Sequence, residues 1–170
     1  MTCIHVYDIT LTGDKVKEKE YLKNIKELIE SDIVLVKKNR LNEENHRLNT
    51  YFNIGKLIVE CQGKKRRAKY GNELIKKWSK ELTELYGKGY DISNLKRMRS
   101  LYLAFQKGGT PCHLSWSHYR YILPIKEISK RNYYINISVK QNLGVRELIE
   151  KIKNNEYERL EYKDEIEIVL

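Results

Sequence analysis

Residues 56–107 read KLIVECQGKKRRAKYGNELIKKWSKELTELYGKGYDISNLKRMRSLYLAFQK, and this stretch carries both the helical pattern and the charge of a 170-residue chain. It holds 14 Lys and Arg against 5 Asp and Glu, whereas residues 1–50 hold 9 against 9 and residues 108–170 hold 10 against 9. Nearly all of the formal net charge of +10 therefore lies in one third of the sequence. A basic surplus this concentrated indicates a surface that binds a polyanion.

Apolar residues in and around this stretch repeat at steps of three and four, which predicts amphipathic helices. The expected helices are 41–62, 72–86 and 94–106, with Asn72 and Ser93 as N-caps of the last two. Gly55 lies inside the first helix, where a glycine costs about 1 kcal/mol relative to alanine. We therefore expect another helix to approach the backbone closely at Gly55.

The helices 72–86 and 94–106, joined by a glycine-containing turn, resemble a helix-turn-helix. The turn, 87–92, is longer than the usual three or four residues, which favours a variant of that motif. The helices 94–106 and 115–123 form a second candidate pair. Two short helices are a weak pattern by themselves, so the placement of charge is what favours nucleic-acid binding.

The two ends of the chain alternate between apolar and polar residues, as strands do. Residues 2–11 (TCIHVYDITL) and 165–170 (EIEIVL) are the expected strands. Because a lone strand is unstable, we expect them to pair with each other or, in a homodimer, with a second copy of the chain. Helices are expected over 15–30, 116–123, 126–140 and 145–155, and the pattern over 31–36 fits either a break or a continuation of the first.

The predicted fold is therefore mainly α: a helical domain with helix-turn-helix-like helices, plus a small β element formed by the terminal strands. We expect an N-terminal appendage over 1–40, the helical domain over 41–160 and a C-terminal strand tail over 161–170. The apolar content of 41% and the charged content of 33% are typical of a globular protein rather than a disordered one.

The candidate DNA-binding residues are cations of the basic stretch and a polar-aromatic cluster that follows it. We expect phosphate contacts from a basic run (residues 64–69), whose cations are Lys64, Lys65, Arg66, Arg67 and Lys69. Groove contacts are expected from the start of helix 94–106, from Lys96, Arg97 and Arg99. The polar-aromatic cluster should contribute more weakly, through Trp116, His118 and Arg120. Three cations near a helix N-terminus are unfavourable unless an anion meets them. The alternatives are a solvated basic face and, for the cluster, a core role in which Trp116 and Tyr119 pack inside and His118 holds the start of its helix.

Several classes of protein find no support in the sequence. No apolar run approaches the roughly 20 residues of a membrane span, and the first residues lack the pattern of a secretory leader. Three cysteines, odd in number and far apart, predict free thiols and a cytoplasmic location. Cys112, His113 and His118 lack the spacing of a structural zinc site, and the triplet 161–163 (EYK) lacks the upstream carboxylates of a metal-dependent nuclease. We therefore expect no catalytic residue, metal or cofactor.

Several motifs between Tyr51 and Leu160 occur in an order that resembles a known family. They are YFNIGKLIVE (51–60), RAKYG (67–71), LT (82–83), YGKGY (86–90), NLKRMR (94–99), LSWSHY (114–119), VREL (145–148) and YERL (157–160). This set is similar to the N-terminal domain of YhcG-type bacterial proteins, a domain of unknown function. The resemblance implies a helical domain that is taken to bind DNA and is usually followed by a PD-(D/E)XK nuclease domain, and it implies that this nuclease domain is missing here.

Together these features predict a cytoplasmic domain that binds double-stranded DNA and is not catalytic by itself. The alternative is a protein-interaction domain that docks a nuclease, or a small inhibitor from a mobile element that blocks a host defence complex. In that alternative the edge of a terminal strand is available for pairing with the partner.

Overall fold

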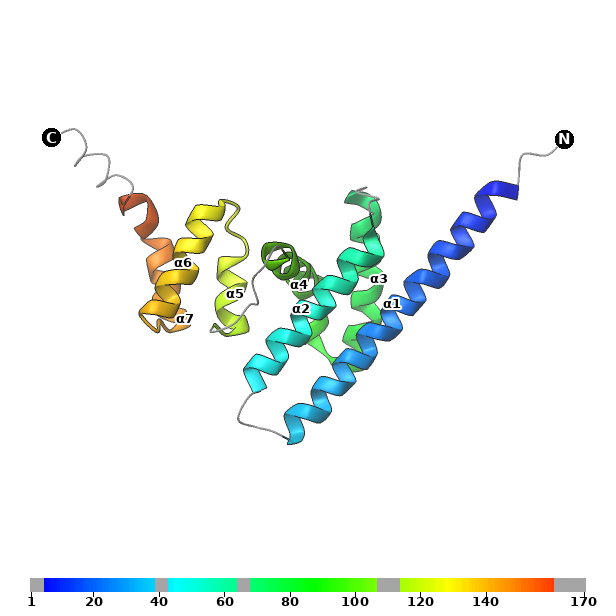
Figure 1. Cartoon of the computed structure of the whole chain (residues 1–170), viewed down its shortest axis with the longest axis horizontal. Helices are drawn as coiled ribbons and strands as arrows, with labels where there is room; N and C mark the ends of the chain where they lie inside the picture. Colours follow the sequence, from blue (N-terminus) through cyan, green and yellow to red (C-terminus); the bar gives the residue numbers. More distant parts are fainter. Residues whose placement is uncertain (1–4, 39–42, 64–67, 107–113, 161–170) are drawn as a thin grey trace. The chain divides into compact units, whose positions relative to one another are not determined.

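The structure, a computed structural model, describes residues 5–38, 43–63, 68–106 and 114–160. The part it describes is built from helices and the turns that join them, and it contains no strand. The helices are α1 (His5–Lys38), α2 (Glu43–Gln62), α3 (Ala68–Tyr86), α4 (Ile92–Phe105), α5 (Trp116–Ile122), α6 (Ile128–Lys140) and α7 (Val145–Lys153), with a short 3-10 turn, η2 (Lys88–Tyr90), between α3 and α4 (Figure 1). One further helical turn covers residues 156–160.

The predicted small β element is wrong for the part of it that the structure describes. Residues 5–11 of the expected N-terminal strand belong to α1, which also runs without a break through residues 31–36. A helix satisfies its backbone hydrogen bonds within the segment, whereas a terminal strand needs a partner strand. The expected strand 165–170 lies outside the described residues.

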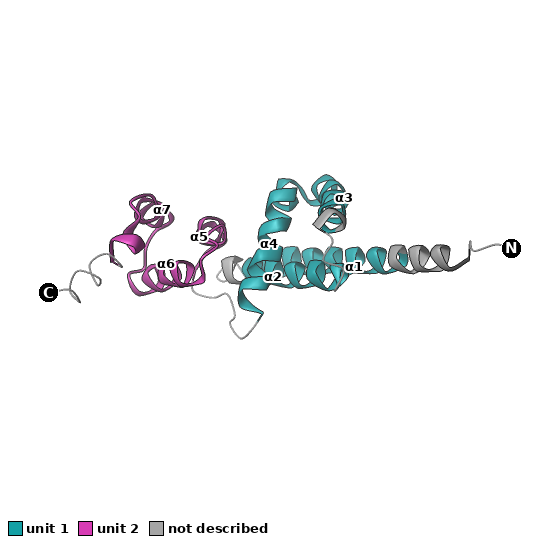
Figure 2. Cartoon of the chain, turned by 90° about the horizontal axis from the view of Figure 1, so that it is seen from above, with its two compact units in different colours: residues 1–109 teal, residues 110–170 magenta. Residues whose placement is uncertain are grey.

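The chain divides into two compact units, which we call unit 1 (residues 1–109) and unit 2 (residues 110–170) (Figure 2). This division falls inside the predicted domain 41–160, and the predicted borders at 40 and 160 stay predictions. Unit 1 holds α1 to α4, and unit 2 holds α5 to α7. Each unit has buried apolar side chains of its own.

In unit 1, α2 packs against α1, α3 and α4. Buried apolar residues recur along α2 at steps of three and four, and the neighbouring helices contribute apolar stripes of their own. The buried apolar side chains are Leu48, Tyr51, Ile54 and Ile58 of α2, Leu22, Ile25 and Ile29 of α1, Leu74, Ile75, Trp78 and Leu82 of α3, and Leu95, Met98 and Leu101 of α4. Burial of this size supplies the main stabilisation of a small helical unit.

Gly55 marks the crossing of α2 and α4. A Cβ at this position would lie 2.1 Å from the carbonyl oxygen of Met98 and 3.1 Å from the Cβ of Tyr102. The backbone of α4 therefore occupies the space that any other side chain would need. The predicted close approach of another helix at Gly55 is confirmed.

Two predicted N-caps are wrong. The helix expected to begin after Asn72 begins at Ala68, so that Asn72 lies inside α3. The N-cap of α4 is Asp91, whose carboxylate accepts a hydrogen bond of 2.7 Å from the backbone N–H of Asn94. Ser93 lies two residues further in, within the first turn of α4, because the carboxylate of Asp91 already satisfies the N-terminal N–H and favours the positive end of the helix.

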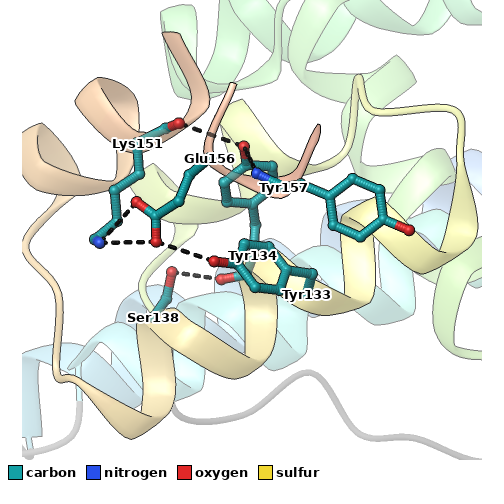
Figure 3. Close-up of polar contacts among 6 residues, drawn as sticks. All are labelled: Tyr133, Tyr134, Ser138, Lys151, Glu156 and Tyr157. Carbon is teal, nitrogen blue, oxygen red and sulfur yellow. Dashed lines mark hydrogen bonds and ion pairs between the residues drawn. The ribbon is translucent and has the colours of Figure 1, made fainter. Parts of the chain in front are cut away.

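Unit 2 is held together by hydrogen bonds between α6, α7 and the turn 156–160 (Figure 3). The hydroxyl of Tyr133 donates to Glu156 at 2.9 Å, and the ammonium of Lys151 donates to the same carboxylate at 2.8 Å. The buried Tyr134 donates its hydroxyl to the carbonyl of Lys151 at 3.3 Å. A second ion pair joins Lys130 of α6 to Glu158. These bonds fasten residues 156–160 to the helices that precede them.

Candidate nucleic-acid interface

The basic run lies mostly outside the described residues. Lys64, Lys65, Arg66 and Arg67 belong to the segment 64–67, of which the structure describes nothing. The backbone of Lys69 lies in the first turn of α3. What the structure does describe is the two ends of this segment, where α2 finishes and α3 begins.

The three cations at the start of α4 do not share one face. Successive residues of an α-helix are turned by about 100°, so residues three apart are neighbours and residues two apart point to different sides. Lys96 and Arg99 are therefore neighbours, whereas Arg97 points to the other side of α4. Lys96 is exposed, and the two arginines are partly exposed.

Gln62, the last residue of α2, connects the end of that helix to both α4 and α3. Its Oε1 accepts a hydrogen bond of 2.7 Å from Nε of Arg99, and its Nε2 donates to the carbonyl oxygen of Gly71 at 3.4 Å. The basic run starts two residues after Gln62 and ends in the first turn of α3, which contains Gly71. The two ends of the segment with the basic run are thus anchored next to the face of α4 that carries Arg99.

Sequence reasoning missed Gln62. A glutamine at the end of a helix carries no recognisable signal, and its partner Arg99 is 37 residues away. On the other side of α4, Arg97 has a similar but longer contact, a hydrogen bond of 3.3 Å from its Nη1 to Oδ1 of Asn94 in the same helix.

Other cations of unit 1 pair with carboxylates of the same unit. Lys26 of α1 contacts Glu81 of α3 at 2.5 Å, and Lys77 of α3 contacts Glu18 of α1 at 3.1 Å. These pairs join α1 to α3, so Lys77 contributes to packing as well as to the basic surplus. Lys76 and Lys80, four residues apart on the outside of α3, are exposed, and no ion pair joins them to the described part of the chain.

The second group of candidate residues lies in unit 2. One ring nitrogen of His118 contacts the hydroxyl of Ser115 at 2.8 Å and the other contacts the carbonyl oxygen of Leu143 at 3.0 Å. Since the carbonyl can only accept, Nε2 carries a proton and donates to it. His118 thus ties the start of α5 to the turn before α7, which agrees with the alternative that it holds its helix. Trp116 is half-buried at the first position of α5, and Arg120 is exposed.

Ser115 occupies the N-cap position of α5, but its hydroxyl makes no capping bond to the backbone. It contacts the ring of His118 instead. In the described part of the chain no cluster of three or more His, Cys, Asp or Glu side chains is arranged to hold a metal ion, and Cys112 and His113 lie outside that part. Likewise, none of the described helices has the length and apolar character to cross a membrane.

The chain matches a known family of protein domains over most of its length. The sequence model of the DUF1016 N-terminal domain matches residues 24–159, which is most of the chain. The chain belongs to the DUF1016 N-terminal domain family. This agrees with the resemblance seen in the motifs between Tyr51 and Leu160, and it extends the match to residue 24, into α1.

A curated relative carries a functional name. A segment of 58 residues, 34% of this chain, is 50% identical to "Putative nuclease YhcG" of Escherichia coli (strain K12). The aligned segment spans only 16% of that relative. No solved structure matches the chain significantly. This DUF1016 N-terminal domain is therefore similar to part of a protein that is named as a nuclease. The description of the family itself names no activity.

Proposed function

We propose that this DUF1016 N-terminal domain binds double-stranded DNA by contacting its phosphate backbone, and that it acts as a binding module rather than as a nuclease. The observation that carries the proposal is the contact of Gln62 with both Arg99 and Gly71. It supports one continuous cationic surface made from the basic run and the Lys96–Arg99 face of α4. Such a surface matches the regular negative charge of a duplex backbone.

A duplex suits this surface better than a single strand does. Proteins that bind single strands without sequence preference offer aromatic rings on which bases stack. Among the described side chains of unit 1, no Tyr, Phe or Trp is fully exposed. The rings contact one another instead: Tyr51 and Tyr90 lie 6.3 Å apart, and Phe52 and Tyr102 lie 5.3 Å apart, between ring centroids.

The test is a binding assay with the full chain and three probes, a 25-base-pair duplex, the single strand and the matching RNA, across a salt series. Six to eight phosphate contacts would lower duplex affinity on the order of 10³-fold or more between 50 and 200 mM salt. Replacing Lys96→Glu should weaken duplex binding on the order of tenfold, while Lys126→Glu, the same charge change at an exposed residue of unit 2, serves as the control. A flat salt response would contradict the proposal.

A protein-interaction domain is the second candidate function. It is favoured by three large apolar side chains near the end of α1, Ile33, Val34 and Leu35, which are 41%, 51% and 48% exposed. Three consecutive exposed apolar residues cover a wide arc of a helix surface, and an exposed apolar patch is typical of a surface that binds another protein. The partner in this reading is a nuclease or a component of a defence complex.

The two candidates are separated by variants at the two surfaces. Under DNA binding, Arg99→Glu abolishes the duplex shift and Leu35→Asp leaves it unchanged. Under the interaction function, Leu35→Asp abolishes binding to the partner nuclease in a purified mixture, and Arg99→Glu leaves that binding unchanged. Circular dichroism of both variants confirms that the helices are retained.

A further inference from the structure

The cations of unit 1 that link one helix to another have two kinds of partner. Lys26 and Lys77, which join α1 to α3, are paired with the carboxylates of Glu81 and Glu18 and so are neutralised. Arg99, which joins α4 to the end of α2, is held by the amide of Gln62, which has no charge. The guanidinium of Arg99 is therefore fixed in position and keeps its full positive charge.

The hydrogen bonds also determine which atoms of Arg99 stay available. The carbonyl of Gly71 can only accept, so the amide nitrogen of Gln62 must face Gly71 and its oxygen must face Arg99. That oxygen accepts a hydrogen bond from the Nε–H of Arg99, which is one of the five N–H donors of the guanidinium. Within the described part of the chain the Nη1 and Nη2 donors have no hydrogen-bond partner. Those two nitrogens form the side of the guanidinium that binds phosphate bidentately.

We propose that Gln62 is a positioning residue that orients Arg99 toward a backbone phosphate of the nucleic acid; this inference rests on the proposed function. A glutamate at position 62 would hold Arg99 equally well in geometry. However, it would neutralise the guanidinium, compete with the phosphate, and lose the donor that contacts Gly71. An amide is the side chain that fixes the guanidinium and leaves it available to an anion.

Replacing Gln62→Glu tests the inference, with the full chain and a 25-base-pair duplex as the probe. We expect the dissociation constant to rise on the order of tenfold and the slope of log affinity against log salt to become shallower by about 0.9, the loss of one phosphate contact. The thermal midpoint should stay within a few degrees, because the new carboxylate still accepts from Arg99. If Gln62 had a purely structural role, the salt slope of Gln62→Glu would equal that of the wild type.

The matched control is Asn94→Asp. It makes the same change from amide to carboxylate beside an arginine, Arg97, on the other side of α4. It also places the new negative charge near the start of the helix, where it is tolerated. We expect its salt slope to equal that of the wild type. If Asn94→Asp and Gln62→Glu reduce the slope equally, a general loss of positive charge rather than the neutralisation of Arg99 explains the effect, and the inference is wrong.

A second variant, Gln62→Met, removes both hydrogen bonds without adding charge. It should keep the charge of Arg99 and so weaken duplex binding less than Gln62→Glu does, while lowering the thermal midpoint more. If the wild type binds the duplex in a salt-dependent way and Gln62→Glu binds equally well, the role of Gln62 is refuted and the proposed function stands. If the wild type does not bind the duplex at all, the proposed function fails first.

Discussion

At Gly55 two opposing effects of a single methyl group can be compared. Alanine in place of glycine favours a helix by about 1 kcal/mol where space allows. At Gly55 the added Cβ would lie 2.1 Å from a backbone carbonyl oxygen of α4, which cannot move aside as the end of a side chain can. Steric overlap should therefore outweigh the gain in helix propensity.

Replacing Gly55→Ala should destabilise unit 1 by about 3 kcal/mol or more, the upper end of the cost of overpacking a core. Urea unfolding followed by circular dichroism measures the change. Gly89→Ala is the control in the same unit, because a Cβ there meets only the hydroxyl of Tyr51 at 4.0 Å and its φ is not left-handed. Equal stability of the two variants would show that α2 and α4 do not pack as closely as described.

Tyrosine has a specific use in this protein, which contains 13 Tyr and only 2 Phe. The hydroxyl of Tyr86 in α3 donates to Glu30 of α1 at 2.7 Å, and that of Tyr133 donates to Glu156. Burial and the hydrogen bond to a carboxylate raise the pKa of Tyr86 and of Tyr133 to about 12. Each ring packs at the edge of the core while its protonated hydroxyl joins two segments, which phenylalanine cannot do.

At the scale of the elements, the carboxylates that hold the turn 156–160 respond to acid. The hydrogen bond from Lys130 lowers the pKa of Glu158 below its ordinary value of 4.5. Burial raises the pKa of Glu156, but hydrogen bonds from Lys151 and Tyr133 outweigh it, so that this pKa is also lowered. Because both values are lower in the folded state, the stabilisation is complete well above pH 4.5 and is lost as the pH falls through the folded values.

We therefore expect the thermal midpoint of unit 2 to fall as the pH drops below about 5, through the ordinary carboxylate pKa and on through the lowered folded values. Glu156→Gln should lower the midpoint at pH 7 and make it less dependent on pH in the acid range. Calorimetry at a series of pH values measures both effects. Glu150→Gln, at an exposed acid of α7, should retain the full acid dependence.

At the scale of the whole molecule, the candidate residues are divided between the two units. The basic run, Gln62, Lys96 and Arg99 belong to unit 1, and Trp116, His118 and Arg120 belong to unit 2. Unit 1 has its own buried core, so it should fold without unit 2. The phosphate surface proposed above needs only unit 1.

A chain that ends at Gly109 should therefore be helical and should bind the duplex with an affinity within about threefold of the full chain and with the same salt slope. Circular dichroism establishes that the fragment folds before its binding is measured. A folded fragment that has lost most of its duplex affinity would indicate that the interface lies in unit 2, with Trp116 and Arg120 as the principal contacts instead of the secondary ones.

Several helices of the structure lie where the apolar pattern of the sequence predicts them. The helices that the pattern places at 41–62, 94–106 and 126–140 occur at Glu43–Gln62, Ile92–Phe105 and Ile128–Lys140. Long apolar stripes with a period near 3.6 specify a helix locally. The alternation over 2–11 is too short to distinguish a strand from the end of a long helix, so the β element was wrong and the continuity of α1 could not be predicted.

The sequence by itself determined that the chain is mainly helical, that its positive charge is concentrated in the middle third, and that its motifs belong to the DUF1016 N-terminal domain family. Only the tertiary structure decided which cations are neutralised by acids and that Gln62 holds Arg99. Periodicity reports the face that a helix buries, because burial repeats with the helical turn. It does not report the partner of a side chain 37 residues away, because that contact depends on how the helices cross.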